Sequence, residues 1–377
     1  MNRFYWIPFF IFSTCTFSVV QAQSSLRFSD SIQISLLTNS PGEDLYAQFA
    51  HSIVRVQDLK LGTDLAFNYG TFDFGAPNFY LNFLRGNLNY QLAVHDARAS
   101  IRHYTRNGQQ LREQVFLLSP KEEQKVASFL IQNAQPENRE YLYDFFYDNC
   151  ATRIRDVMEN EVEGFSYLEA DVEVYTFRQM LDLYMHDNPW TDFGMDLILG
   201  VPTDQVADMR DQMFLPDFLA QNLYEFARNN EQPLLSEPKF INNIAPTTTE
   251  PTWLTPLVVG VILLIVSGLL FFFVSRRTKK VFDNVFFIIL SLAGFIITFM
   301  WLGTDHWTTT NNLNVIWASP LFLIFLILKK RKWLAVAAIG LAGFVLLLGW
   351  LLPQQFHLAF IPIWLSMIVR GVDILKN

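Results

Sequence analysis

The second part of the chain alternates long apolar segments with short polar connections. Its apolar segments are close to the ~20 residues that a helix needs to cross a bilayer, once tilt and interfacial ends are allowed for. They cover residues 254–274, 285–302, 315–328, 333–352 and 358–372. This pattern predicts an all-α domain of five transmembrane helices at residues 256–377.

Lys and Arg gather in alternate connections. RRTKK separates the first two segments, KKRK separates the third and fourth, and Arg370 and Lys376 lie near the C-terminus. The connections TDHWTTTNNLN and PQQFH contain neither residue. Because basic loops stay in the cytoplasm, we expect a multi-pass protein of the bacterial inner membrane with residues 23–253 in the periplasm. Residues 1–22 agree with this, since Arg3, an apolar run and a small residue at Ala22 predict a cleaved signal peptide.

The first part of the chain changes from strand-like to helix-like patterns. β-branched and aromatic residues predict strands, and Ser119, Pro120 and Glu122 form a helix-start signature. The expected strands are 47–58, 64–74, 87–95 and 110–118, and the expected helices are 119–133, one starting at 150, 176–186 and 204–229. Strands before helices predict an α+β periplasmic domain at 23–244, joined by a Pro/Thr-rich linker at 245–255.

Composition separates the two parts further. The 377 residues are 51% hydrophobic and 17% charged, with a net charge of −8. From residue 253 onward there are ten Lys or Arg against three Asp or Glu, so the part before it carries −15. An acidic first part argues against nucleic acid as a partner.

Cys150 stands at the expected helix start in YDFFYDNCATRIRD. Cys15 would leave with the signal peptide; a lipid-attachment box at Cys15 is the rival interpretation, and its neighbours fit that poorly. Asn149 is a good helix cap, and the helix dipole with Arg153 and Arg155 should lower the pKa of the thiol. Free N–H groups of the first turn would suit an oxyanion. The alternative is a buried cysteine that only packs.

A thiolate nucleophile needs a base, and we select His51 because small neighbours leave its imidazole accessible in a strand. His95 and His103 read as surface residues, and His186 as a cation at a helix end. In the loop TDHWTTTNNLN, Asp305 and His306 are candidates for binding substrate, and an interfacial polar role for His306 is the alternative.

The motifs AHSIVRV, FNYGTFDF, PNFYLNFLRGNLNY, YDFFYDNCATRIRD, WTDFGMDLILGVPTD and TDHW resemble the Lnb-type envelope proteins. These have a periplasmic domain and a membrane domain, and the resemblance covers nearly the whole mature chain. It implies lipoprotein N-acyltransfer. A more distant likeness, to permuted NlpC-type papain-like proteins such as lecithin:retinol acyltransferase, implies Cys150 as nucleophile and His51 as base. Asn68 is then a candidate for orienting His51.

The resemblance implies a phospholipid as acyl donor and a diacylated lipoprotein as acceptor, with a thioester on Cys150 between the two steps. We expect no cofactor and no metal ion. A membrane-anchored cysteine peptidase or amidase of the cell wall would share the Cys–His pair. An envelope scaffold or sensor with a buried Cys150 is the non-enzymatic alternative.

Overall fold

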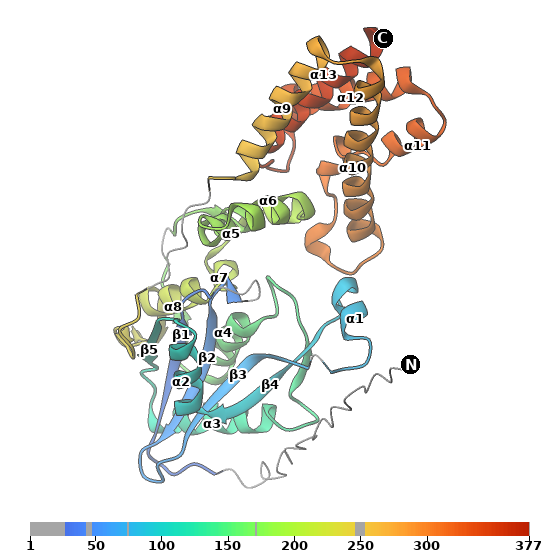
Figure 1. Cartoon of the computed structure of the whole chain (residues 1–377). Helices are drawn as coiled ribbons and strands as arrows, with labels where there is room; N and C mark the ends of the chain where they lie inside the picture. Colours follow the sequence, from blue (N-terminus) through green and yellow to red (C-terminus); the bar gives the residue numbers. More distant parts are fainter. Residues whose placement is uncertain (1–26, 43–46, 74, 170–171, 246–252, 377) are drawn as a thin grey trace, which may run out of the picture.

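The computed structural model describes residues 27–42, 47–73, 75–169, 172–245 and 253–376 (Figure 1). The predicted signal peptide and most of the predicted linker lie outside these residues. The described chain forms an N-terminal part with strands and helices, followed by a C-terminal helical part.

The N-terminal part is built on an antiparallel sheet of seven strands in the order β12-β5-β1-β2-β3-β4-β6. β1 and β2 pair along their lengths, which sets Asn39 opposite His51. Two small sheets contain β11-β10-β7 and β8-β9. The strands are β1 (Ile32–Asn39), β2 (His51–Asp58), β3 (Asp64–Phe72), β4 (Asn89–Asp96), β5 (Leu111–Val115), β6 (Glu140–Leu142), β7 (Phe165–Tyr167), β8 (Tyr175–Thr176), β9 (Val206–Ala207), β10 (Ala227–Asn229), β11 (Gln232–Pro233) and β12 (Lys239–Phe240).

Helices cover the large sheet on both sides. The main core joins Val54 of the sheet to α3, α4 and α8, and a smaller core joins Ile53 to α2. Successive residues of β2 thus enter different cores, as the pleat of a strand requires. The helices are α1 (Phe79–Arg85), α2 (Ala97–Arg106), α3 (Pro120–Asn133), α4 (Cys150–Glu161), α5 (Phe177–Met185), α6 (Pro189–Ile198), the 3₁₀ helix η3 (Val201–Asp204), α7 (Met209–Gln212) and α8 (Pro216–Glu225).

The mixture of strands and helices is confirmed, and so is the capping box of Ser119 and Glu122 at α3. The predicted helix at 204–229 is wrong: it is divided into β9, α7, α8 and β10. Leu215 is extended and Pro216 opens α8, because the residue before a proline avoids the helical region. α1 and α2 also interrupt the strands, so the order of strands first and helices afterwards is not strict.

The C-terminal part contains the helices α9 (Pro256–Phe273), α10 (Arg276–Leu302), α11 (Leu321–Ile327), α12 (Arg331–Leu348) and α13 (Phe360–Lys376), with 3₁₀ turns η4 (Trp307–Thr309), η5 (Leu313–Ile316) and η6 (Gly349–Leu351). Among the described residues, three helical stretches are long and apolar enough to cross a membrane: Pro256–Phe273, Arg276–Leu302 and Arg331–Leu351. α11 has seven residues and α13 has 17, so the count of five crossings stays a prediction.

Three charged residues of this helical part, Asp283, Arg370 and Asp373, are buried, and each has an ion-pair partner. Nε of Arg370 lies 2.7 Å from Asp283, and Nη2 lies 2.7 Å from Asp373. Asp283 also meets Arg331 at 3.1 Å, and Asp373 meets Lys279 at 3.0 Å. Buried charges are tolerated when they are paired in this way. The charges of Arg370 and Asp373 are thus compatible with the apolar helix α13, because both side chains face other helices and are paired there.

The connection between α10 and α11 fixes the helical part to the N-terminal part. The N–H of Gly200 donates to Thr308 O at 2.8 Å, and Nδ2 of Asn312 donates to Ile198 O at 2.8 Å. Nδ2 of Asn314 donates to Asp196 O at 2.8 Å. These hydrogen bonds hold α6 against the C-terminal helices. They lie at the end of α10 that is nearest to the large sheet (Figure 1).

Candidate active site

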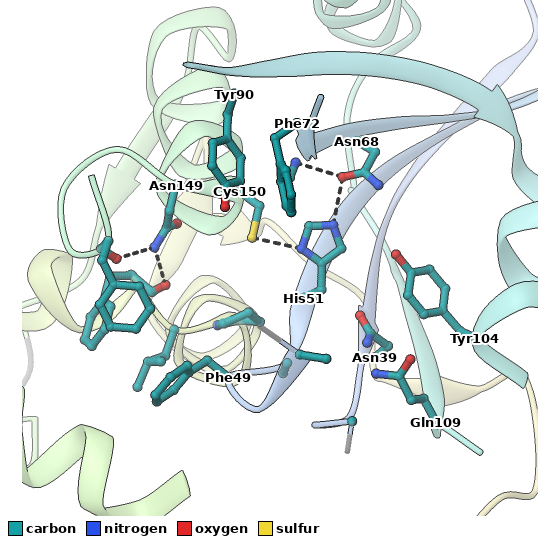
Figure 2. A pocket seen from close by; sticks show the side chains of 18 of the residues that line it. Asn39, Phe49, His51, Asn68, Phe72, Tyr90, Tyr104, Gln109, Asn149 and Cys150 are labelled. Atoms are coloured by element: carbon teal, nitrogen blue, oxygen red, sulfur yellow. Dashed lines mark hydrogen bonds between the residues drawn. The ribbon is translucent and has the colours of Figure 1, made fainter. Parts of the chain in front are cut away.

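A pocket of about 430 Å³ opens beside α4 and the first residue of β2 (Figure 2). His51, Asn68 and Cys150 all line it. The structure therefore brings together three residues that are distant in sequence, on β2, β3 and α4.

Cys150 is the first residue of α4, and Asn149 fixes the chain there. Oδ1 of Asn149 accepts the N–H groups of Ala151 at 2.8 Å and Thr152 at 3.0 Å. Its Nδ2 donates to the carbonyl oxygens of Phe145 and Phe214. Because every polar atom of this side chain is used, the cap holds the thiol at the helix start as predicted.

His51 makes two contacts that define its chemistry. Nδ1 lies 3.0 Å from Sγ of Cys150, and Nε2 lies 2.8 Å from Oδ1 of Asn68. The same Oδ1 accepts the N–H of Gly70 at 2.8 Å, which identifies it as the oxygen of the amide. Nε2 must then carry the proton, so the neutral ring turns the lone pair of Nδ1 toward the sulfur.

Gly70 is a site residue that sequence reasoning missed. A Cβ at this position would lie 2.3 Å from Cε1 of His51, far inside van der Waals contact. The imidazole thus rests against bare backbone. The one available signal was the spacing in NYGTF, which places a glycine two residues after Asn68.

His51 and Cys150 shift each other's pKa, each favouring the charged form of the other. Burial would raise the pKa of Cys150, but the positive charge and hydrogen bond of His51, with the N–H groups of Ser52 and Ala151, lower it overall. Burial would likewise lower the pKa of His51, and Cys150 and Asn68 raise it overall. Both directions favour a thiolate beside an imidazolium, which is the reactive form of a nucleophilic cysteine.

Two parts of the predicted electrostatics need correction. Arg153 is bound by Asp148 and Arg155 by Asp156, so their charges are neutralised locally and His51 is the cation that acts on the thiol. The N–H groups of Ala151 and Thr152 are taken by the cap. The N–H of Cys150 has no acceptor among the described residues, so its geometry would allow it to donate to an oxyanion.

One wall of the pocket is apolar and aromatic. Burial, and then the charge of Cys150, raises the pKa of Tyr90 to about 12, so its hydroxyl stays protonated where it points toward the sulfur (Figure 2). Tyr90 stacks on Tyr143 at 4.2 Å between ring centroids. This wall contains Phe49, Phe72, Tyr90, Tyr143, Phe145, Phe214, Leu215 and Pro216.

The opposite wall is polar. Asn39 is 3% exposed, and its Oδ1 has no hydrogen-bond donor within the described part of the chain. In Figure 2 it lies below His51, beside Gln109. His103, predicted as a surface residue, also borders this wall, whereas His95 and His186 do not line the pocket. The wall contains Asn39, His103, Tyr104, Asn107 and Gln109.

The structure places Asp305 and His306 outside the pocket lining, in the contact between the two parts of the chain. Asn87 Nδ2 donates to Asp305 at 2.7 Å, and His306 Nε2 donates to Phe83 O at 3.1 Å. The next residue, Trp307, donates to Asp144 at 2.8 Å and stacks on Tyr147. The membrane loop therefore braces the segment that leads into Cys150.

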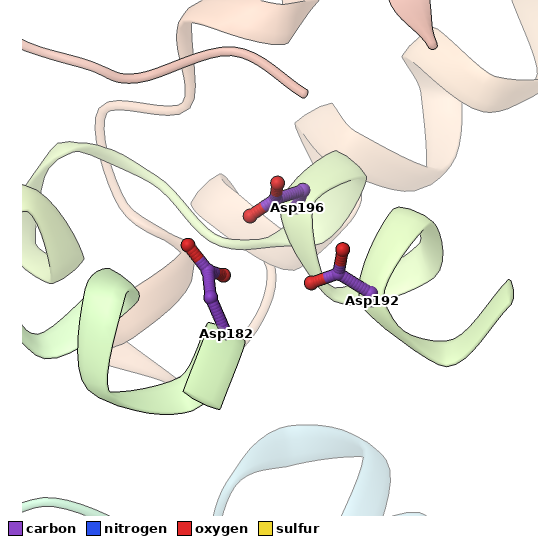
Figure 3. A group of neighbouring side chains, drawn as sticks. All are labelled: Asp182, Asp192 and Asp196. Atoms are coloured by element: carbon purple, nitrogen blue, oxygen red, sulfur yellow. The ribbon is translucent and has the colours of Figure 1, made fainter. Parts of the chain in front are cut away.

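One group of carboxylates among the described residues has the spacing of a cation site: Asp182, Asp192 and Asp196 (Figure 3). Arg178 already binds Asp196, and Nε2 of His357 lies 3.2 Å from Asp192. His357 Nδ1 accepts the N–H of Ala359, so Nε2 carries a proton and is no ligand in this arrangement. These groups join α5 and α6 to the segment before α13.

The fold and the pocket describe a membrane protein with a cysteine–histidine site beside its helices. Comparison with known families then identifies the group. The Lnb N-terminal periplasmic domain matches residues 22–183, and the Lnb transmembrane domain matches residues 248–376. The chain belongs to the Lnb family, which fits a membrane-associated role in modifying lipoproteins and suggests an enzyme. Neither a curated protein nor a solved structure gives a match.

Proposed function

We propose that this protein is a lipoprotein N-acyltransferase that uses Cys150 as its nucleophile. The observation that carries the proposal is the 3.0 Å contact between Nδ1 of His51 and Sγ of Cys150, inside a pocket with one apolar and one polar wall. The Lnb membership supports it, because it joins this pocket to a transmembrane domain.

In the first step, the Cys150 thiolate attacks the ester carbonyl of a phospholipid. The N–H of Cys150 donates to the oxyanion that forms. The ester C–O bond then breaks, and the leaving alkoxide takes the proton of the His51 imidazolium. A thioester remains on Cys150, and a lysophospholipid departs with its new hydroxyl group.

In the second step, the α-amino group of a diacylglyceryl-cysteine attacks the thioester. His51 is now neutral, and Nδ1 accepts the proton that the amine loses as the amide bond forms. The C–S bond breaks and the thiolate returns beside the imidazolium. Asn68 keeps the ring in the same orientation for both steps, since Nε2 stays protonated throughout.

The two walls suit the two substrates. The aromatic wall accepts the acyl chain, whose removal from the bilayer costs about 0.8 kcal/mol per CH₂ unless the protein covers it. The polar wall receives the amine, and Asn39 in that wall carries an amide oxygen that no donor satisfies within the described residues. Donor and acceptor would then approach Cys150 from opposite sides.

The arrangement also supports a permuted papain-like site and five membrane crossings. His51 opens a strand and Cys150 opens a later helix, in the chain order of the permuted proteins. In Figure 1, α9 leads away from the N-terminal part and α10 returns toward it. Arg276 at the far end and the basic 329–332 connection fit a cytoplasmic side, with the pocket in the periplasm.

A cell-wall peptidase would use the same pair of residues. The aromatic wall and the bracing of Cys150 by a membrane loop favour a lipid substrate instead. The decisive experiment replaces Cys150 with Ser in cells that depend on this protein and determines lipoprotein N-termini by mass spectrometry. The proposal predicts diacylated N-termini with a free amine; undiminished triacylated species would end it.

A further inference from the structure

Helix α1 (Phe79–Arg85) exposes an unusual amount of apolar surface. Tyr80, Leu81, Phe83 and Leu84 are 77%, 44%, 55% and 45% exposed, and none of the seven residues of α1 is buried. Contiguous exposed apolar side chains mark a surface that contacts a partner or a membrane. Water alone is therefore a poor environment for this helix.

The position of α1 indicates which environment it has. The N–H of Asp305 donates to Arg85 O at 2.7 Å, and His306 Nε2 donates to Phe83 O at 3.1 Å. Asp305 lies only three residues beyond Leu302, the last residue of the membrane helix α10. Figure 1 shows α1 directly beyond that end of α10. The exposed apolar side chains of α1 are thus carried on a helix that is attached directly to the end of a membrane helix.

A line of aromatic contacts connects α1 to the pocket. Phe83 stacks on Phe79 at 6.4 Å, and Phe79 stacks on Phe72 at 5.8 Å between ring centroids. Phe72 contacts Tyr90 at 5.0 Å, and both line the pocket beside Cys150. Apolar surface therefore extends from the membrane side of the molecule to the sulfur.

We propose that α1 lies in the outer leaflet of the membrane and guides a phospholipid acyl chain along Phe79 and Phe72 to Cys150. Phospholipid is the occupant because the helix is attached to the end of a membrane span. Arg85, the one charged residue of α1, is exposed and can meet a lipid phosphate. The guiding role rests on the proposed acyl transfer, but the contact between α1 and lipid does not.

The lipid contact is tested without catalysis. A photoreactive benzoyl-phenylalanine is introduced at Phe83 in Cys150→Ser protein, which is reconstituted in vesicles of phosphatidylethanolamine and phosphatidylglycerol. The matched control carries the same group at Leu61, which is 64% exposed in the β2–β3 turn, remote from the membrane helices (Figure 1). Mass spectrometry should find phospholipid adducts at Phe83 and not at Leu61. Equal labelling at both positions, or none at Phe83, would overturn the proposal.

The guiding role is tested by combining Phe83→Ser with Leu84→Ser, against a control that combines Leu59→Ser with Leu61→Ser. The α1 variant should form acyl-enzyme from vesicle phospholipid at least about tenfold more slowly, since it loses two apolar contacts with lipid. Iodoacetamide should alkylate Cys150 at the unchanged rate, which shows an intact site. Equal rates of acylation in the two variants would refute guidance. If the unaltered protein forms no acyl-enzyme, the proposed function fails, while the cross-link still decides where α1 lies.

Discussion

Oδ1 of Asn68 lies 2.8 Å from Nε2 of His51, and this contact decides which ring nitrogen carries the proton. The same oxygen accepts the N–H of Gly70, so the amide of Asn68 cannot turn over without losing that hydrogen bond. Nδ1 is left to face Cys150 at 3.0 Å. Asn68 on β3 thereby determines the tautomer of His51 on β2.

The pH dependence of thiol alkylation should reveal the charge sharing between His51 and Cys150. The pKa of Cys150 is lowered, so its thiolate should form, and react with iodoacetamide, at a lower pH than the thiolate of an ordinary cysteine. In His51→Ala the pKa of Cys150 loses the lowering effect of the imidazole. The backbone N–H groups still lower this pKa, whereas burial raises it. The midpoint should move up, with a loss of at least about tenfold in rate at pH 7.

His103→Ala is the control for that experiment, because His103 borders the pocket without contacting Cys150 through a hydrogen bond. Its alkylation profile should match that of the unaltered protein. An unchanged midpoint in His51→Ala would show that the imidazole does not stabilise the thiolate.

Gly70→Ala should slow acyl transfer by displacing the imidazole. The added Cβ would lie 2.3 Å from Cε1 of His51, and a displacement of about 1 Å at a catalytic group can cost about 100-fold. The matched control is Gly194→Ala, where a Cβ meets nothing within 4 Å. Rates of acyl-enzyme formation measure the effect. Full activity of Gly70→Ala would mean that the ring position is not critical.

Local signals made some of this site predictable from sequence. Asn149 caps the helix of Cys150 through atoms two and three residues away, so the motif alone indicates where α4 begins. The same holds for Ser119 and Glu122 at α3. Their partners are neighbours in sequence, and no tertiary contact is needed to form them.

Contacts between distant strands were beyond sequence reasoning. Asn39 borders the pocket because β1 pairs with β2 in the register that sets Asn39 opposite His51. Gly70 touches His51 only because β2 and β3 are adjacent. Helix α1 was missed because apolar residues exposed around a short helix leave no periodic pattern to detect.

Asn39→Ala should impair the second step of the reaction and spare the first. Loss of a buried acceptor for the amine should raise the KM for the lipoprotein acceptor about tenfold, in line with the 1–2 kcal/mol of such a hydrogen bond. Acyl-enzyme formation and Cys150 alkylation should stay unchanged. Asn39→Asp keeps an acceptor oxygen and should restore much of the loss. An equal fall in both steps would instead indicate general damage to the site.

Asp182→Asn should stabilise the protein at alkaline pH. Burial, with the charges of Asp196 and Asp192, raises the pKa of Asp182 to about 7. The folded state therefore holds a proton that the unfolded state releases near pH 4, and stability falls as pH rises from about 4 to 7. Asparagine has no proton to lose. The melting temperature of the variant should exceed that of the unaltered protein by a few degrees at pH 8, with a smaller difference at pH 5.

The exposed Glu137 provides the control for that comparison, since Glu137→Gln removes a charge without altering the carboxylates of Asp182, Asp192 and Asp196. Its melting temperature should follow that of the unaltered protein at both pH values. A variant at Asp182 that is less stable at pH 8 would show that its carboxylate is a favourable partner for the groups around it.

The central claim is that Cys150 carries the acyl group between two substrates. The most direct measurement is intact-protein mass spectrometry of the purified protein in phospholipid vesicles, followed by addition of a diacylglyceryl-cysteine peptide. The account predicts a mass increase of one acyl chain on Cys150, absent in Cys150→Ser, which disappears as the peptide gains an N-acyl group. Peptide N-acylation by Cys150→Ser at the unaltered rate, or the absence of any adduct on Cys150, would contradict it.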